Sequence, residues 1–348
     1  MKAVLFNKPY HPLVETVADP EMLYSTDVIV KVEITAICGS DLHIYAGRET
    51  GLDADTIMGH EFVGTVMEVG ADVKQFKKGD RVISPFFSAC GVCDPCGEGL
   101  SCRCDSGQLF GWREKGKGLH GAQAQFVRVP LADHTLMTLP DDLSVHEALL
   151  LCDILPTGLF GTDFRPAFEN QSLSVVGCGP VGLMAIAGAQ FRGWNKVIAF
   201  DPDKNRRVMA TKMGAIAFDP LNADDMLRFQ DQTQGKGSDV VAEAVGSVQA
   251  HATSYQIVKK GGNIRSMGVH NEPSFAFSPN DLYNKNITYS TGRCPVQKYW
   301  PEALELVRSK KYDVGAIFTH ENSVEEAVES YKKFNNKEEG GLKFTLVF

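Results

Sequence analysis

The chain has 348 residues, of which 43% are hydrophobic and 22% are charged, and its formal net charge is −8 at pH 7. This length suffices for two domains of ordinary size. The acidic balance, without any Lys/Arg cluster, argues against nucleic acid as a partner, and no stretch approaches the roughly 20 apolar residues of a membrane span. We therefore expect a protein of the reducing cytoplasm, where disulfides are rare.

Residues 1 to about 140 have the pattern of short β-strands. The opening segment is MKAVLFNKPYHPLVE, and its apolar run is too short for a signal peptide. The segment has the pattern of a first β-strand. Runs rich in Val, Ile and Phe predict further strands at 27–38, 61–70, 80–84 and 124–129. This half of the chain is therefore expected to be β-rich.

Three short stretches carry residues that can bind a metal. CGSDLH (38–43) ends a predicted strand, GHE (59–61) opens another, and CDILPTG (152–158) precedes the second half of the chain. Cys38, His60 and Asp153 would supply one sulfur, one nitrogen and one oxygen, a set that zinc accepts with a fourth position open. Glu61 would act as a further ligand or support one.

Each of these residues also has an ordinary structural explanation. Cys38 alone could be a buried thiol, His60 a hydrogen-bonded loop histidine and Asp153 a helix cap. The spacing of these residues does not by itself join them into one site. Cys152, next to Asp153, competes for the same ligand position because thiolate is also a zinc ligand.

Five cysteines crowd into residues 90–104, CGVCDPCGEGLSCRC. Cys90, Cys93 and Cys96 form a C-x2-C-x2-C run, and either Cys102 or Cys104 could supply a fourth thiolate. The glycines and the proline between them predict a tight loop on which the thiolates converge. Four thiolates make the closed tetrahedral shell of structural zinc, and a group of unrelated reduced thiols is the alternative.

The second half of the chain alternates between strands and helices. Apolar runs predict parallel strands at 172–177, 196–201, 238–246 and 261–268, with helices at 180–191 and 203–213. This alternation predicts a doubly wound α/β sheet. The remaining residues predict helices at 296–309 and near 323–334 and a final strand at 342–348, which we expect to return to the first domain.

GCGPVG (177–182) directly follows a predicted strand and opens a helix. Gly177 permits the tight turn, Gly179 lets the backbone approach a pyrophosphate, and Gly182 lets the helix pack on the strand. Asp201 ends the next strand, where a carboxylate binds the adenosine ribose hydroxyls and favours NAD over NADP, and Arg206 lies close enough in sequence to reach a phosphate. A glycine-rich turn that binds nothing is the alternative.

The chain resembles the zinc-dependent medium-chain dehydrogenases/reductases, the alcohol dehydrogenase superfamily. The resemblance lies in four motifs that occur in the same order: CGSDLH, GHEFVGTVMEVG, the four-cysteine segment, and GCGPVG with the acidic residue that follows it. The resemblance covers essentially the whole chain. It implies a GroES-like β-rich catalytic domain at 1–153 and 294–348, with a structural-zinc lobe at 90–104. It also implies a Rossmann NAD-binding domain at 154–293.

The same resemblance assigns the metal ligands. Cys38, His60 and Asp153 match the ligands of the catalytic zinc, and Glu61 matches a residue that exchanges on and off the metal. The C-x2-C-x2-C-x7-C spacing of the structural lobe selects Cys104 rather than Cys102.

CDILPTGLFG and GPVGLMAIAGA look most like secondary alcohol dehydrogenases. This likeness implies reversible hydride transfer between an alcohol and NAD, by a homo-oligomer that is a dimer or a tetramer. Ser40 and His43 would carry the substrate proton away. Thr157, Val181 and Met267 would hold the nicotinamide ring. Trp112, Cys294 and Arg293 would face the substrate.

Other functions remain open at this stage. Arg293 stands where an apolar residue is expected, and a dehydrogenase of polyols or other functionalised alcohols is the alternative enzyme. A zinc-stabilised nucleotide-binding protein of the same fold is the non-catalytic alternative. The cysteines alone would also suit a zinc-ribbon nucleic-acid module, but the acidic balance argues against it.

Overall fold

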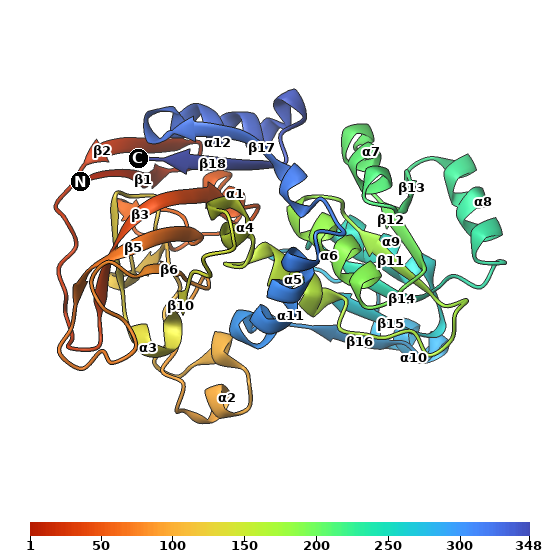
Figure 1. Cartoon of the computed structure of the whole chain (residues 1–348). Coiled ribbons are helices and arrows are strands. Elements are labelled where there is room, and N and C mark those ends of the chain that lie inside the picture. Colours follow the sequence, from red (N-terminus) through yellow and green to blue (C-terminus); the bar gives the residue numbers. More distant parts are fainter. The chain divides into compact units, whose positions relative to one another are not determined.

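The computed structural model describes residues 1–348, and the chain divides into two compact units, both drawn in Figure 1. Unit 1 comprises Met1–Asp153, Pro295–Trp300 and Gly315–Phe348, and unit 2 comprises Ile154–Cys294 and Pro301–Val314. None of the helices is both long and apolar enough to cross a membrane.

Unit 1 is built mainly from antiparallel strands. One sheet has the order β2-β1-β4, and a larger one has the order β10-β6-β5-β3-β18-β17, with β9 also paired to β3. A small hairpin joins β7 to β8. The strands are β1 (Lys2–Lys8), β2 (His11–Thr16), β3 (Val28–Ile37), β4 (Thr56–Ile57), β5 (Phe62–Val69), β6 (Arg81–Ile83), β7 (Trp112–Glu114), β8 (Lys117–Leu119), β9 (Phe126–Val129), β10 (Met137–Thr138), β17 (Phe318–Ser323) and β18 (Lys343–Val347).

The helices of unit 1 are mostly short and connect these strands. They are α1 (Asp41–Tyr45), α2 (Asp94–Gly97), α3 (Ala132–Thr135), α4 (Val145–Leu150) and α12 (Ala327–Asn336), with 3-10 turns η1 (Ser101–Arg103), η2 (Val314–Ile317), η3 (Val324–Glu326) and η4 (Glu338–Gly340). The cysteine-rich segment therefore contains one α-helical turn and one 3-10 turn, where the sequence predicts only a loop. Pro95 stands near the start of α2, where its missing N–H costs nothing.

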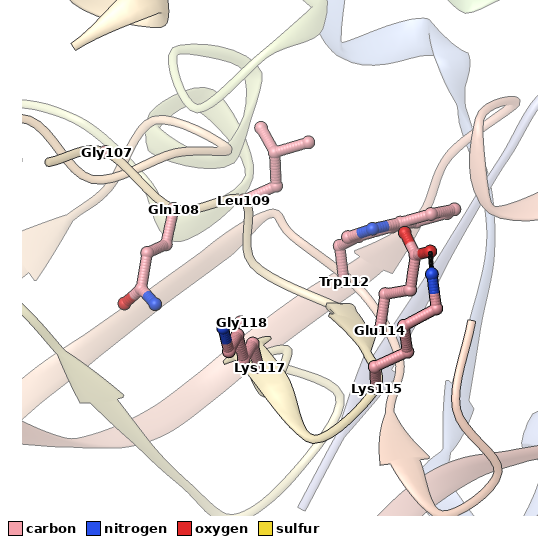
Figure 2. A pocket seen from close by; sticks show the side chains of 8 residues that line it. All are labelled: Gly107, Gln108, Leu109, Trp112, Glu114, Lys115, Lys117 and Gly118. Carbon is pink, nitrogen blue, oxygen red and sulfur yellow. Dashed lines mark ion pairs between the residues drawn. The ribbon is translucent and has the colours of Figure 1, made fainter. Parts of the chain in front are cut away.

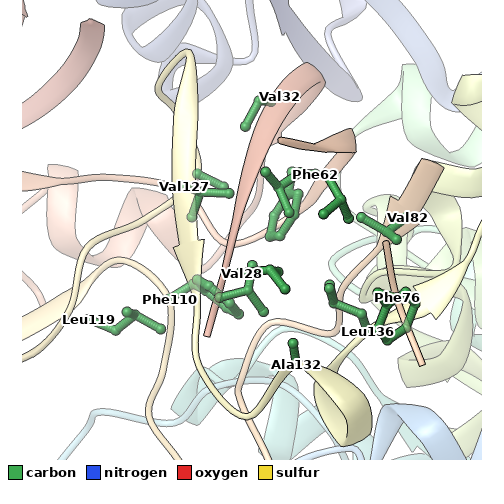
Figure 3. Close-up of a cluster of buried hydrophobic side chains, with 14 residues drawn as sticks. Val28, Val32, Phe62, Phe76, Val82, Phe110, Leu119, Val127, Ala132 and Leu136 are labelled. Atoms are coloured by element: carbon green, nitrogen blue, oxygen red, sulfur yellow. The ribbon is translucent and has the colours of Figure 1, made fainter. Parts of the chain in front are cut away.

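A hydrophobic core fills the space around the central strand β3. Val28 and Val32 of β3 pack with Phe62, Val127 and other buried apolar side chains, as Figure 3 shows. Val30 belongs to the same cluster. The exposed Lys31 between Val30 and Val32 follows the two-residue alternation of a strand. This packing makes β3 a rigid support for the residues at its carboxyl end.

The last strand of the chain lies beside this support. β18 pairs antiparallel with β3, with Phe344 opposite Ile37, and parallel with β17. The C-terminus therefore returns to the N-terminal sheet.

Unit 2 contains six parallel strands in the order β13-β12-β11-β14-β15-β16, the arrangement of a doubly wound dinucleotide-binding sheet. The strands are β11 (Ser172–Val176), β12 (Lys196–Phe200), β13 (Ile216–Phe218), β14 (Ser238–Glu243), β15 (Val258–Ser266) and β16 (Thr288–Thr291). The helices are α5 (Ile154–Gly161), α6 (Pro180–Phe191), α7 (Lys204–Lys212), α8 (Ala223–Gln232), α9 (Val248–Ile257) and α10 (Pro279–Lys285). The predicted α/β fold class with a parallel Rossmann sheet is confirmed.

The expected domain boundaries stay a prediction, and the division into compact units places two stretches differently. All of 294–348 was expected with the first domain, but Cys294 and Pro301–Val314 belong to unit 2. Helix α11 (Val296–Ser309) contains the boundary. Its residue Glu302 accepts hydrogen bonds at 2.8 and 2.6 Å from the buried guanidinium of Arg192, and this ion pair ties the segment to unit 2.

Candidate metal centre and nucleotide site

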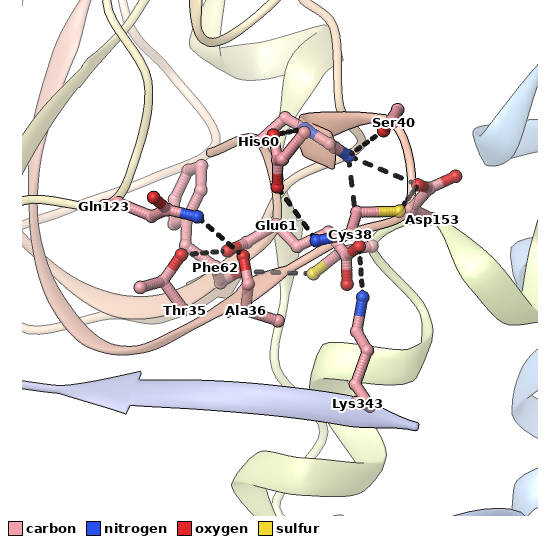
Figure 4. A network of polar contacts seen from close by, with 12 residues as sticks. Thr35, Ala36, Cys38, Ser40, His60, Glu61, Phe62, Gln123, Asp153 and Lys343 are labelled. Atoms are coloured by element: carbon pink, nitrogen blue, oxygen red, sulfur yellow. Dashed lines mark hydrogen bonds and ion pairs between the residues drawn. The ribbon is translucent and has the colours of Figure 1, made fainter. Parts of the chain in front are cut away.

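Four metal-binding side chains of unit 1 converge on one point, as Figure 4 shows. The donor atoms of Cys38, His60, Glu61 and Asp153 all lie within 4.8 Å of one another. The Cys38 sulfur lies 3.5 Å from Asp153 Oδ2, and His60 Nε2 lies 3.4 Å from the same oxygen. Cys38 follows the end of β3, His60 and Glu61 come just before β5, and Asp153 comes just before α5. Three segments that are far apart in the chain therefore meet at this cluster.

Asp41 orients two of these residues, and sequence reasoning missed it. Its Oδ2 accepts a hydrogen bond of 2.8 Å from the backbone N–H of Cys38, and its Oδ1 lies 3.2 Å from His60 Nδ1. A carboxylate on one ring nitrogen turns the other nitrogen toward a metal. The signal was present in CGSDLH, where Asp41 follows Cys38 by three residues.

The electrostatics of this cluster suit a cation. Burial raises the pKa of the Cys38 thiol. Burial acts to lower the pKa of His60, but the charge of Asp41 and the hydrogen bond with Asp153 hold that pKa well above its usual value. A divalent cation would replace these protons on the same atoms. The sulfur, nitrogen and oxygen donors therefore fit zinc.

Cys152 does not join the cluster. Its sulfur is fully buried and donates to the carbonyl oxygen of Phe62 at 3.2 Å. Burial raises the pKa of this thiol to about 12, so it is not a thiolate at neutral pH. The geometry therefore favours Asp153 over its neighbour as the ligand.

Ser40 and His43 lie beside the metal-binding cluster. Ser40 Oγ is 3.3 Å from His60 Nε2, on the face where the donor atoms converge. His43 lies in α1, half-buried, and burial lowers its pKa to about 4. His43 is therefore neutral at pH 7.

A second cluster of thiols forms in the lobe of residues 90–104. The sulfurs of Cys90, Cys93, Cys96 and Cys104 lie within 4.8 Å of one another. The backbone N–H of Cys90 also donates to the Cys104 sulfur at 3.1 Å. Cys102 is buried outside this set, so the geometry selects Cys104. Four protein ligands leave no position for a substrate, so this cluster fits a structural zinc, and its role stays a prediction.

The glycine-rich turn of unit 2 has the geometry of a phosphate cradle. Gly177 has a φ of +91°, and a Cβ on Gly182 would lie 1.8 Å from the Gly177 carbonyl oxygen. Gly179 caps α6, and the only atoms near its missing Cβ belong to the guanidinium of Arg206, at 3.7 Å and beyond. The helix N-terminus and the guanidinium together suit the pyrophosphate of a dinucleotide.

Asp201 is already part of this turn. Its Oδ2 accepts a hydrogen bond of 2.8 Å from the backbone N–H of Cys178, and its Oδ1 accepts one of 2.8 Å from Asp203. Arg206 lies 3.9 Å from the same carboxylate, which is only 3% exposed. Asp201 therefore holds the turn in shape, a role that the sequence pattern did not reveal.

The comparisons with known proteins agree over the whole chain. The family described as "Alcohol dehydrogenase GroES-like domain" matches residues 24–141, and "Zinc-binding dehydrogenase" matches residues 180–309. Zinc-type alcohol dehydrogenase B of Aspergillus flavus is 37% identical over 343 residues, which cover 96% of this chain and 79% of that protein. The chain therefore belongs to the zinc-dependent alcohol dehydrogenase family.

Two further relatives of this alcohol dehydrogenase are informative. The NADP-dependent isopropanol dehydrogenase of Thermoanaerobacter brockii is 32% identical over 303 residues and covers 84% of each chain. The solved structure of alcohol dehydrogenase TADH from Thermus sp. ATN1 matches with a TM-score of 0.91 at 35% identity, over 100% of this chain and 99% of that one. The predictions of the family, of an oxidoreductase and of zinc with a nicotinamide dinucleotide as cofactors are confirmed.

The residues predicted to hold the nicotinamide lie in unit 2 of the dehydrogenase. Thr157 is buried in α5, and Val181 is the second residue of α6. Met267 follows β15, and its methyl carbon would lie 2.2 Å from a Cβ on Gly161 at the end of α5. Their contact with the cofactor stays a prediction.

The predicted substrate residues divide between the units. Trp112 begins β7 and lines a surface hollow of about 520 Å³ with Gln108, Leu109 and the β7–β8 hairpin, drawn in Figure 2. Arg293 and Cys294 follow β16, with Arg293 half-buried and Cys294 buried. Their role in a substrate pocket also stays a prediction.

Replacing Cys93 by Ser should remove the lobe zinc of this dehydrogenase and lower its thermal stability, because metal binding and folding are linked. We expect about two zinc ions per chain in the wild type and about one in the variant. Elemental analysis and thermal unfolding measure both effects. Cys102→Ser is the matched control and should keep both zinc ions; a loss of zinc in the control equal to that in Cys93→Ser would contradict the assignment.

Proposed function

We propose that this enzyme catalyses reversible hydride transfer between a secondary alcohol or ketone and NAD. The observation that carries the proposal is the convergence of Cys38, His60 and Asp153 on one point, with Glu61 held by an ion pair. Three protein ligands leave the fourth position of a tetrahedral zinc to a substrate. The motifs CDILPTGLFG and GPVGLMAIAGA support a secondary alcohol.

The residues of the chain perform the steps around the reacting atoms. When bound, zinc supplies a Lewis acid that lowers the pKa of a hydroxyl group, and the dinucleotide supplies the hydride acceptor. Ser40, whose hydroxyl lies 3.3 Å from His60 Nε2, accepts the substrate proton and passes it on. His43 is neutral and half-buried, and it receives the proton on its way to solvent.

Other side chains hold this machinery in place. Asp41 fixes the ring of His60 and the backbone of Cys38. In unit 2, the glycine turn and Arg206 bind the pyrophosphate, Asp201 faces the adenosine ribose, and Thr157, Val181 and Met267 hold the nicotinamide. The enzyme thus contributes placement and charge, while the cofactor carries the hydride.

A dehydrogenase of polyols or other functionalised alcohols is the second candidate. The observation that favours it is Arg293, a half-buried cation immediately before the buried Cys294. A guanidinium in a substrate pocket would bind hydroxyl or anionic groups rather than an alkyl chain. We further propose that the enzyme is a cytoplasmic homo-oligomer, a dimer or a tetramer, whose substrates are small molecules.

A substrate screen tests the proposed function. NADH formation should be fastest with secondary alcohols, slower with primary alcohols and slowest with polyols. Faster oxidation of polyols by the purified enzyme would favour the second candidate. Absence of dehydrogenation with every alcohol, by enzyme that contains zinc, would contradict both.

NAD should be preferred over NADP, and Asp201→Asn should reduce this preference at least about tenfold. Two like charges about 4 Å apart repel by roughly 4 kcal/mol at an effective dielectric near 20, so the carboxylate disfavours a ribose phosphate. The variant removes that charge and one acceptor for the turn amides. The ratio of kcat/KM for the two cofactors measures the effect, and a wild-type preference for NADP would overturn the assignment.

A further inference from the structure

Lys343 is a buried cation at the edge of the metal centre. It is the first residue of β18, its side chain is 0% exposed, and its Nζ lies 2.5 Å from Glu61 Oε1. The Glu61 side chain is also 0% exposed. Figure 4 shows Lys343 reaching Glu61 from the last strand, with the side chains of Cys38, His60 and Asp153 close by. Burying two charges is costly unless they pair with good geometry and further hydrogen bonds satisfy their remaining polar atoms.

Lys343 reduces an excess of negative charge in the metal centre. A zinc ion would neutralise the Cys38 thiolate and the Asp153 carboxylate. Glu61 and Asp41 then remain as buried anions. Asp41 lies 3.2 Å from His60 Nδ1. The ammonium of Lys343 lies 2.5 Å from Glu61 Oε1, so Lys343 is the cation that pairs with Glu61.

The carboxylate of Glu61 is engaged on one oxygen only. Oε1 binds Lys343 and lies 3.9 Å from His60 Nε2. Oε2 is buried and makes no hydrogen bond with the protein. A buried carboxylate oxygen without a hydrogen bond is rare, and a bound cation is one partner that would satisfy it.

We propose that Lys343 is a positioning residue that holds Glu61 away from the catalytic zinc and so keeps the fourth metal position open for substrate. Without the ammonium, the unpaired Glu61 carboxylate becomes the fourth protein ligand and closes the shell, as four protein ligands do in structural zinc sites. This inference rests on the proposed function, because it assumes that zinc binds Cys38, His60 and Asp153. Lys343 acts through Glu61 and touches no substrate.

The test uses Lys343→Met in the purified full-length enzyme loaded with cobalt, whose visible spectrum reports coordination. Imidazole binds the open position and shifts the spectrum, while the closed lobe gives a constant background. We expect Lys343→Met to weaken imidazole binding at least about tenfold and to slow metal release to a chelator by a similar factor, within the range of effects seen for residues behind metal ligands.

Three variants complete the design. Lys343→Arg keeps the charge and should bind imidazole like the wild type. The double variant Glu61→Gln/Lys343→Met lacks the closing carboxylate and should also bind it like the wild type. Lys2→Met removes another ammonium of unit 1, one paired with Glu325 at the surface, and should change neither readout.

Several outcomes would overturn the inference. Imidazole affinity and metal release in Lys343→Met that equal those of the wild type would show that the lysine only stabilises the fold. A double variant that binds imidazole as weakly as Lys343→Met would exclude Glu61 as the closing group. If Lys343→Met does not fold, the variant Glu61→Gln tests the inference. Loss of metal from the open site in this variant would show that Glu61 already binds the metal, which contradicts the inference. Failure of wild-type enzyme to bind cobalt at this site would instead contradict the proposed function.

Discussion

Replacing Asp153 by Asn should lower kcat by more than about a hundredfold and reduce the occupancy of the catalytic zinc. Residues behind a metal ligand typically change affinity or activity by about 10- to 100-fold, and the loss of an anionic ligand should exceed that. Asp153 Oδ2 lies 3.4 Å from His60 Nε2 and 3.5 Å from the Cys38 sulfur, which places it directly among the donor atoms. Zinc content and steady-state kinetics, measured on the same preparation, check the result.

Cys152→Ala is the matched control for this prediction. Its thiol bonds to the carbonyl oxygen of Phe62 and not to the metal-binding atoms, so the variant should keep its zinc and most of its activity. A modest loss of stability is expected because a fully buried side chain is truncated. If Cys152→Ala abolished turnover while Asp153→Asn did not, the zinc ligand would be Cys152 and not Asp153.

Ser40→Ala should lower the rate of alcohol oxidation by about 100-fold or more, the range of general acid–base catalysis, with NAD affinity nearly unchanged. The Ser40 hydroxyl oxygen lies 3.3 Å from His60 Nε2, the ring nitrogen that faces the metal-binding cluster. It forms no side-chain cap on helix α1, so its removal should not loosen that helix. Single-turnover kinetics and fluorescence titration with NAD separate the two effects.

His43→Gln is the comparison for Ser40→Ala. Its effect on the rate should be smaller, because a water molecule can stand in for a distal member of a proton path. Burial lowers the pKa of the wild-type imidazole to about 4, so it is neutral above that pH and would hold a relayed proton only transiently. Equal and large losses of NAD affinity in both variants would indicate structural roles instead.

Much of the fold could be predicted from local sequence patterns. The strands β3, β5, β11 and β12 and helix α6 lie where Val-, Ile- and Ala-rich runs predicted them. The pattern did not predict short strands such as β7, β8 and β13, because three residues contain too little periodicity to distinguish a strand from a loop. Neither did it predict that α11 divides between the units, since tertiary contacts such as the ion pair between Arg192 and Glu302 leave no mark in a local pattern.

The metal centre shows where sequence reasoning ends. Cys90, Cys93 and Cys96 lie within one loop, so their spacing alone predicts a shared ligand site. Cys38 and Asp153 are 115 residues apart, and only the resemblance to a known family joined them before the structure brought their atoms to 3.5 Å. The choices that spacing left open, Cys102 or Cys104 and Cys152 or Asp153, depend on which way each side chain points.

By itself, the sequence determined the class of chemistry. The zinc lobe, the glycine turn and the acidic residue after it can be predicted from residue types and short spacings. These features depend on only a few neighbouring dihedral angles and donor atoms. Only the tertiary structure decided how the charges of the open site are balanced. Lys343 and Glu61 are 282 residues apart, and their ion pair exists because β18 pairs with β3, whose carboxyl end carries Cys38. No local pattern marks a lysine in a final strand as part of a metal centre, since burial and pairing are set by packing across the whole chain.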